Sequence, residues 1–240
     1  MSDDSPASGL QEQLSTFWSG RAASRPAGTM EVRNDEEHAA WMESLRPFLP
    51  SAPVDALDVG TGQGFLALLL ADLGHRVIGV DTAAGMLEGA RGHAVNSANP
   101  PDFRLGNAMY PPLQPASVDV VSNRQVVWTL LDPAQAFRNW LALLRPGGIV
   151  LSVHLRQNAS STGSQYPDEV KDRLPALPID ATGVVKATRA DRNYPDAVAH
   201  LARETGFLDV VLTSLAAVNR YEESIGTDRR WLVLTGKKPT

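Results

Sequence analysis

The sequence Leu57-Asp58-Val59-Gly60-Thr61-Gly62-Gln63-Gly64 closes a short run rich in apolar residues that starts at Val54. This run predicts a buried strand over Val54–Val59, and the leucine- and alanine-rich residues Phe65–Leu73 predict a helix directly after it. Between them, glycines at alternate positions predict a tight turn whose backbone N–H groups a ligand can approach closely. The stretch therefore predicts a strand–turn–helix unit with a ligand at the turn.

Strand and helix patterns alternate along the chain after this unit. Further strands are predicted over Arg76–Val80, Phe103–Leu105, Val118–Ser122, Ile149–His154, Phe207–Leu215 and Arg230–Thr235. Further helices are predicted over Ala83–Ala94, Pro133–Leu144 and Pro195–Thr205. Alternation of this kind favours a doubly wound α/β domain with a mostly parallel sheet that is covered on both faces.

The residues before Val54 carry helical patterns only. Leu10–Trp18 and Asp35–Leu49 have helical spacing, Arg21–Gly28 predicts a loop between them, and Ser2–Gly9 predicts a disordered lead-in. We therefore expect residues 1–50 to form an N-terminal helical cap, and residues 51–240 to form the main domain.

The stretch Arg156–Asn193 interrupts the alternation of strands and helices. It is polar, contains three prolines and has no long periodic segment. A stretch of this length inside a compact domain is usually a functional insertion, so we expect residues 156–193 to cap the substrate site. Together with Leu10–Met30, it is expected to form a mobile lid.

Composition excludes several classes of protein. The chain has 240 residues, 43% of them hydrophobic, which suffices for one large domain with a sizeable core. It has no cysteine, which excludes disulfides, thiolate metal sites and cysteine nucleophiles.

The net charge of −5 comes from acidic and basic residues mixed along the chain, so no nucleic-acid partner is expected. Because the sequence shows neither a long apolar segment nor a signal-peptide pattern, we expect no membrane partner and a cytoplasmic location.

The turn and Asp81 together predict a ligand that contains a ribose. Asp81 ends the second strand, where its carboxylate can accept hydrogen bonds from both ribose hydroxyls, with a helix N-cap as the alternative role. A dinucleotide fingerprint has glycines at its first, third and sixth positions, whereas Gly64 comes one position early after Gly60 and Gly62. The spacing therefore disfavours a pyrophosphate-binding turn.

From Leu57 to Leu151 the order of motifs resembles the class I S-adenosylmethionine-dependent methyltransferases. The glycine turn is similar to the family's first motif, Val77-Ile78-Gly79-Val80-Asp81 to its acidic ribose motif, and Leu144-Arg145-Pro146-Gly147-Gly148 to the turn before its fifth strand. Asp119-Val120-Val121-Ser122 is similar to its fourth strand. The resemblance implies a Rossmann-like sheet of seven strands, mostly parallel, with an antiparallel C-terminal strand.

The resemblance also implies S-adenosylmethionine as the cofactor. In Gly106-Asn107-Ala108, Asn107 stands where the family commonly has aspartate, and its side-chain oxygen can accept the same bond from an adenine amino group. Members of the family with a similar Phe-Trp-x-x-Arg-Ala-Ala start often continue with Tyr-Asp, whereas this chain continues with Arg25-Pro26. A tyrosine contact with the methionine part of the cofactor is therefore not expected, and Trp18 and Arg21 are the residues available for it. The expected cofactor-binding residues are Trp18, Arg21, Asp58, Gly60, Thr61, Gly62, Gly64, Asp81, Thr82, Met86, Asn107, Ala108 and Asn123.

Methyl transfer from a sulfonium is an in-line displacement, so alignment and exclusion of water can supply most of the catalysis. His154 is the candidate base, and a structural hydrogen bond at a strand end is its alternative role. Trp128 is expected to stack on the substrate or the sulfonium, and Arg124 to bind an acidic substrate. The alternative role of Trp128 is packing under the next helix, and the alternative role of Arg124 is a surface salt bridge.

Two further observations concern the polar residues. Asp58 is charged at the end of a buried strand, so it must be bonded, either to turn N–H groups alone or also to the amino group of the cofactor. The histidines at positions 38, 75, 93 and 200 have no spacing that indicates a metal site, so no metal is expected.

The sequence thus predicts an enzyme that transfers a methyl group from S-adenosylmethionine to an oxygen, nitrogen or carbon of a small-molecule metabolite. A nicotinamide-dependent oxidoreductase and a non-catalytic cofactor-binding protein are the alternatives. The substrate, the acceptor atom and the oligomeric state are not indicated.

Overall fold

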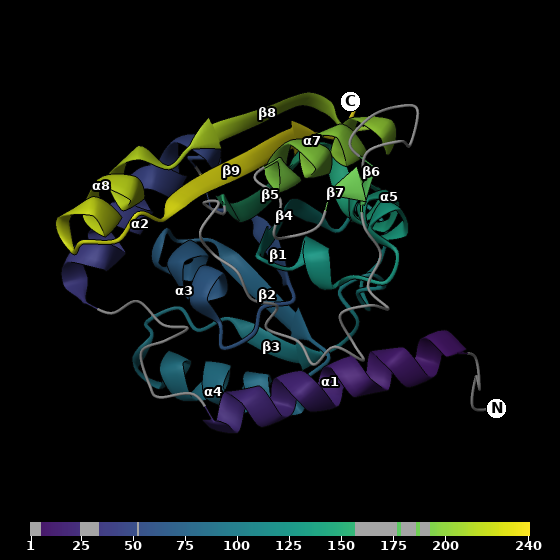
Figure 1. Cartoon of the computed structure of the whole chain (residues 1–240), viewed down its shortest axis with the longest axis horizontal. Coiled ribbons are helices and arrows are strands. Elements are labelled where there is room, and N and C mark those ends of the chain that lie inside the picture. The colour runs from purple at the N-terminus through teal and green to yellow at the C-terminus, as the bar shows by residue number, and fades with distance from the viewer. Residues whose placement is uncertain (1–5, 25–33, 52, 157–176, 179–185, 188–192) are drawn as a thin grey trace.

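The computed structural model of the chain describes residues 6–24, 34–51, 53–156, 177–178, 186–187 and 193–240. Seven strands form one sheet in the order β3-β2-β1-β4-β5-β9-β8 (Figure 1). These strands are β1 (Asp55–Val59), β2 (Arg76–Asp81), β3 (Asp102–Leu105), β4 (Val118–Arg124), β5 (Leu144–Arg156), β8 (Leu208–Ser214) and β9 (Arg230–Lys237). A short separate hairpin consists of β6 (Leu177–Pro178) and β7 (Lys186–Ala187).

The helices alternate with the strands along most of the chain. They are α1 (Pro6–Ser24), α2 (Asp35–Leu45), α3 (Phe65–Asp72), α4 (Ala84–His93), α5 (Pro133–Leu143), α7 (Tyr194–Glu204) and α8 (Ala216–Ser224). Short 3-10 helices are η1 (Arg46–Phe48), η2 (Ala94–Asn96) and η3 (Val127–Thr129). Over the part of the chain that is described, no helix is long and apolar enough to cross a membrane.

The sheet has the topology that the sequence predicts. β1 pairs in parallel with β2 and β4, β2 with β3, and β4 with β5. β9 is antiparallel to both of its neighbours, β5 and β8. The sheet is therefore mostly parallel with a reversed final strand, which confirms the predicted fold class.

Two helices differ from the sequence prediction. α1 starts at Pro6 inside the predicted lead-in and continues to Ser24 through part of the predicted loop; proline suits the first turn of a helix, and Ala22-Ala23 favours continuation. The helix α8 has no predicted counterpart. Its buried residues include the polar Asn219 and Glu222, which mask its apolar periodicity.

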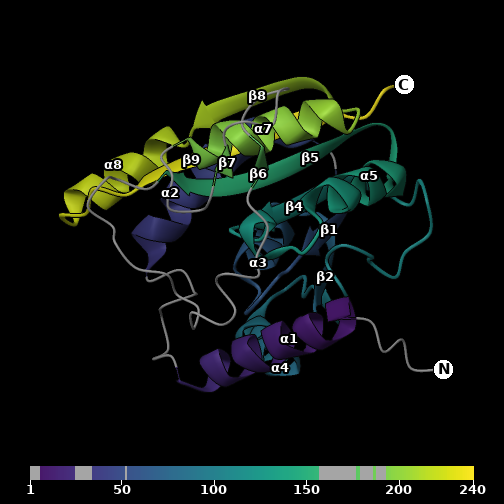
Figure 2. The same cartoon turned by 45° about the vertical axis from the view of Figure 1, so that its right-hand side comes forward.

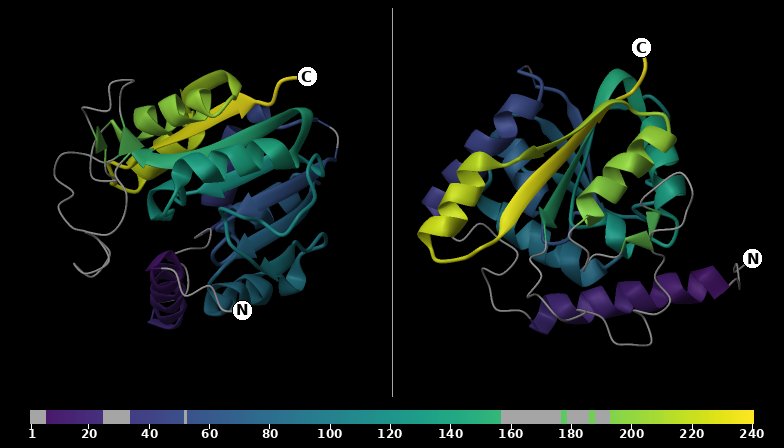
Figure 3. Two further views of the ribbon diagram at one scale, coloured as in Figure 1. Left: turned by 90° about the vertical axis from the view of Figure 1, so that its right-hand side faces the viewer. Right: turned by 45° about the horizontal axis from the view of Figure 1, so that its top comes forward.

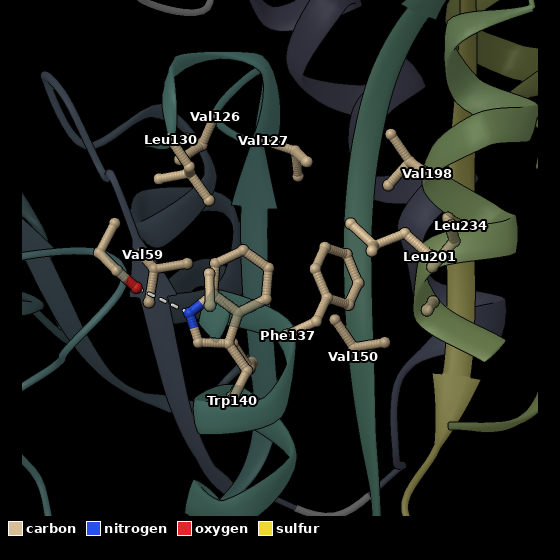
Figure 4. Packing of buried hydrophobic residues seen from close by; sticks show 14 of the residues in the cluster. Val59, Val126, Val127, Leu130, Phe137, Trp140, Val150, Val198, Leu201 and Leu234 are labelled. Atoms are coloured by element: carbon tan, nitrogen blue, oxygen red, sulfur yellow. Dashed lines mark hydrogen bonds between the residues drawn. The ribbon is translucent and has the colours of Figure 1, made fainter. Parts of the chain in front are cut away.

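Helices cover both faces of the sheet. On one face, Phe137 and Trp140 of α5 and Val198 of α7 pack with strand residues such as Val150 (Figure 4). Figure 2 shows α5 and α7 on the near side of β5 and β9. On the other face, buried residues of α2, α3, α4 and α8 share a second cluster. Burial on both faces explains why central strands such as β1 are mostly apolar, whereas the edge strands β3 and β8 are largely exposed.

α1 lies outside these two layers. The Ser15 hydroxyl donates to the carbonyl oxygen of Thr82 at 2.7 Å, and α1 runs beside α4 (Figure 1). β9 ends with Lys237 paired to Ile149, near the start of β5, so the C-terminus marks the amino edge of the parallel strands. Figure 3, in its right-hand view, shows α1 at the opposite end of the molecule. α1 therefore lies at the carboxyl edge.

One buried hydrogen bond connects the α5 face to a loop at that edge. Trp140 Nε1 donates to the carbonyl oxygen of Ala108 at 2.7 Å (Figure 4). We expect Trp140→Phe to lower the free energy of unfolding by about 1–3 kcal/mol, because the buried carbonyl loses its donor. Urea denaturation measures this loss, and hydrogen exchange should show faster exchange at the amides of residues 106–110.

Phe137→Leu is the matched control, because it also reduces a buried ring of α5 but removes no hydrogen bond. It should destabilise the fold without selectively accelerating exchange in residues 106–110. Equal acceleration in both variants would contradict a specific role for the Trp140 bond.

Candidate active site

The turn between β1 and α3 requires glycine. Gly60, Gly62 and Gly64 have φ angles of 63°, 57° and 87°, in the left-handed region. A Cβ atom at Gly60 would lie 2.6 Å from Cγ2 of Val126, and one at Gly64 would lie 3.0 Å from the Phe103 ring. The turn therefore lies close against its neighbours and leaves its backbone accessible on the remaining side.

Asp81, at the end of β2, holds this turn in place. Its Oδ2 accepts a hydrogen bond from the Gly62 N–H and its Oδ1 one from the Ala83 N–H, both at 2.9 Å. Asp81 is not the N-cap of α4, because Ala83 holds that position and no side chain caps the helix. Burial raises the pKa of Asp81, and the backbone donors oppose that rise. Each carboxylate oxygen has a further lone pair, so both can also accept bonds from ribose hydroxyls.

Asp58 lies beneath the turn and is 2% exposed. Its Oδ1 accepts a hydrogen bond from the Ser122 hydroxyl at 2.8 Å, whereas the N–H groups of Thr61 and Gly62 donate to Val80 and Asp81. Burial raises the pKa of Asp58 to about 6, although the nearby Arg124 guanidinium opposes that rise. A cation above the turn would favour the ionised form of this carboxyl.

A cavity of about 320 Å³ lies between the turn, the strand ends and α1. This volume is within the range of small-molecule sites, roughly 300–1,000 Å³. The expected cofactor residues that line it are Trp18, Gly60, Gly62, Asp81, Thr82, Met86, Asn107 and Ala108. The expected substrate residues Arg124 and Trp128 line it as well. Residues far apart in the sequence therefore meet at one cavity.

The other expected cofactor residues lie elsewhere. Asp58, Thr61 and Gly64 are buried in and under the turn. Asn123 is buried on the α5 and α7 side, where its Oδ1 accepts a hydrogen bond from the Ser152 hydroxyl at 2.7 Å. The side chain of Arg21 lies outside the described part of the structure.

The Asn107 side chain already participates in its own loop. Its Oδ1 accepts a hydrogen bond from the Met109 N–H at 2.8 Å, and the Asn139 side chain of α5 donates to the Met109 carbonyl at 2.7 Å. The sequence assigns the Asn107 oxygen to an adenine amino group. In the structure one of its two lone pairs serves the loop, which leaves one for a ligand.

His154 is not among the residues that line the cavity. It is 1% exposed, its Nε2 lies 2.8 Å from the Ser152 hydroxyl oxygen, and its ring faces Tyr194 with 6.0 Å between centroids. Burial lowers its pKa to about 3. A base must reach the proton that it removes, so this geometry supports the alternative, structural role.

Sequence reasoning missed one wall of the cavity, formed by Leu155, Arg229 and Trp231. Leu155 of β5 pairs with Trp231 of β9. Because β9 is antiparallel, its first residues lie at the carboxyl edge beside the last residues of β5. The sequence predicts an antiparallel final strand. That prediction is the signal that could have placed the start of the strand, and so this wall, beside the end of β5. The remaining cavity residues, also missed, are Gln11, Leu14, Gln125, Val126, Thr129 and Leu130.

Similarity to known proteins extends over most of the chain. Residues 57–152 match a family model described as "Methyltransferase domain". A ubiquinone biosynthesis O-methyltransferase of Thiobacillus denitrificans is 29% identical over 82% of this chain and 83% of its own length. One of Dinoroseobacter shibae is 32% identical over 68% of this chain and 70% of its own length. The crystal structure of the cyclase SpnF superposes with a TM-score of 0.61 at 19% identity, over 97% of this chain and 96% of that chain.

The contact of Gly60 with Val126 gives a test of the turn. We expect Gly60→Ala to destabilise the fold by about 1–2 kcal/mol from its left-handed backbone and by roughly a further 1–3 kcal/mol from overpacking. Gly147→Ala is the control, because Gly147 has a φ of 75° but nothing within 4 Å of a Cβ atom. Urea unfolding of both variants separates the backbone contribution from the overpacking contribution. Equal losses of unfolding free energy in the two variants would contradict overpacking against Val126.

Burial of neutral His154 predicts a pH dependence. Its folded pKa of about 3 lies below the usual 6.5, so its contribution to stability is present above pH 6.5 and is lost as the pH falls towards 3. His154→Gln keeps an N–H donor without a titrating ring. Between pH 7.5 and pH 5, the unchanged protein should lose about 2 kcal/mol more unfolding free energy than the variant. If urea unfolding showed the same loss of unfolding free energy in both proteins over this pH range, His154 would not be a buried neutral ring.

Proposed function

This chain belongs to the class I S-adenosylmethionine-dependent methyltransferases, and on that premise we propose that it methylates an oxygen atom of a small metabolite bound in the cavity beside α1. S-adenosylmethionine is its methyl donor. The names of the two bacterial relatives, both O-methyltransferases, support oxygen as the acceptor atom. The observation that carries the proposal is that the glycine turn, Asp81 and the Asn107 loop line one cavity.

The polar groups that line the cavity match those that the cofactor would need to bind. Absence of side chains at Gly60 and Gly62 leaves backbone open toward the ligand, and the Asp81 carboxylate retains lone pairs for ribose hydroxyls. The Asn107 oxygen and the neighbouring Ala108, which also line the cavity, would border the adenine ring. Asp58, beneath the turn, supplies negative charge for the amino group of the methionine part.

Catalysis follows from positioning rather than from a dedicated base. When bound, the cofactor would supply an electrophilic methyl group on a sulfonium; the residues of the cavity would hold the acceptor oxygen in line with the methyl–sulfur bond, so that the thioether leaves as the oxygen–methyl bond forms. Trp18 of α1 and Trp128 of η3 form one wall, with ring centroids 6.3 Å apart. With the apolar Leu14 and Leu130 they keep water away from the reacting atoms and limit the orientations of the acceptor. The proton of the acceptor leaves to solvent, and His154 has no part in this step.

Calorimetry with S-adenosylhomocysteine and with NAD tests the proposal. We expect S-adenosylhomocysteine to bind with a dissociation constant on the order of micromolar, about −8 kcal/mol, and NAD to show no binding. Asp81→Asn should weaken S-adenosylhomocysteine binding by roughly 10- to 100-fold, because a charge-assisted acceptor of ribose hydroxyls is lost.

Asp102→Asn provides the control. Asp102 begins the neighbouring strand β3, pairs with Arg104 and does not line the cavity. Its substitution should leave the affinity unchanged. Unaltered affinity in Asp81→Asn would leave Asp81 only the role of holding the turn, and tighter binding of NAD would contradict the proposed cofactor site.

A further inference from the structure

Resting on the proposed function, we propose that the end of the cavity formed by Arg124, Arg229 and Trp231 is an anion subsite for the methyl acceptor. The acceptor is then a flat, aromatic molecule that carries one carboxylate or phosphate group. Its anionic group lies against the two arginines, and its ring lies among the apolar side chains that line the cavity.

Three adjacent strands build this end of the cavity. Arg124 is the last residue of β4 and pairs with Val153 of β5, two residues before Leu155. Leu155 pairs in turn with Trp231 of β9. The Arg124 guanidinium carbon lies 3.8 Å from the centroid of the Phe65 ring and 5.5 Å from that of the Trp231 ring. Stacking against these rings fixes the planar guanidinium at the rim of the strands.

This end of the cavity is separate from the ribose position. Asp81 is on β2, and the sheet order from there is β1, β4, β5 and β9. Four strand spacings separate β2 from β9, roughly 19 Å. A cofactor with its ribose at Asp81 and its methionine part over the turn would leave the wall beyond β4 for the acceptor.

The charges that line the cavity are divided between its two ends. Asp81 is the acidic lining residue, whereas Arg124 and Arg229 are the basic ones. Two further acidic groups face the arginines from behind the wall. Asp58 lies near Arg124 beneath the turn, and Glu222 of α8 lies 3.8 Å from Nη1 of Arg229.

Glu222 is engaged by several donors at once. Its Oε1 accepts a hydrogen bond from Trp231 Nε1 at 3.1 Å, and its Oε2 accepts one from the Thr227 hydroxyl at 2.6 Å. These bonds orient the Trp231 ring and hold the carboxylate behind it. Guanidinium groups match carboxylate and phosphate oxygens through paired N–H donors, so the arginine end of the cavity favours an anionic group.

The remaining lining residues favour an apolar body. Leu14, Val126, Leu130 and Leu155 line the cavity beside the tryptophans. A flat ring between such side chains is held with little loss of conformational freedom and gains stacking energy. An aromatic acid satisfies the apolar walls and the arginines together.

Matched probes test this subsite in the full-length protein saturated with S-adenosylhomocysteine. Benzoate, phenyl phosphate and neutral benzamide are titrated by calorimetry. At least one of the two anions should bind tenfold or more tightly than benzamide, and benzoate against phenyl phosphate identifies the preferred anion. Arg124→Gln and Arg229→Gln should each remove most of that preference.

Arg230→Gln is the control variant. Arg230 follows Arg229 directly, pairs with Glu223 at 2.8 Å and does not line the cavity, so its substitution should keep the preference for anions. Equal binding of the anions and benzamide, or no binding of any probe, would overturn the anion subsite. So would a tenfold loss of S-adenosylhomocysteine affinity in Arg229→Gln, because the arginine would then hold the cofactor. Failure of S-adenosylhomocysteine itself to bind the unchanged protein would instead contradict the proposed function.

Discussion

The carboxylate of Asp81 is the contact on which the site depends. It accepts N–H groups from the turn after β1 and from the start of α4, so two segments that follow neighbouring strands share one acceptor. Without it, the N–H of the left-handed Gly62 would lose its acceptor, which is costly in a buried turn. The crevice at the strand ends is therefore formed before a ligand arrives, and a ribose adds its bonds to a carboxylate that is already in position.

The hydrophobic core supports the site through α5. Trp140 and Asn139 donate to the carbonyl oxygens of Ala108 and Met109, which fixes the loop after β3 at the far end of the cavity from Trp231. α1 adds the outer wall through the bond from Ser15 to Thr82. Side chains on rigid elements thus position the loop, whose Ala108 and Met109 are themselves buried in the core, as expected where loops carry binding groups on a rigid scaffold.

The sequence determined the features that depend on local order. Apolar runs predicted central strands such as β1, because a strand that is covered on both faces is mostly apolar. The left-handed turn followed from Gly60, Gly62 and Gly64, since only glycine adopts this backbone without strain. The position of Asp81 one strand later predicted that its carboxylate would lie beside the turn, because parallel strands end at the same edge.

Only the tertiary structure decided which polar side chains face the cavity. The sequence could not show that α7 covers His154, or that the polar residues of α8 are satisfied by Trp231 of β9, because these contacts join residues far apart in the chain. It also gave no sign that Arg229 shares a cavity with Arg124. A side chain at a strand end points to solvent, core or ligand according to what packs against it, and local periodicity does not show which distant element that will be.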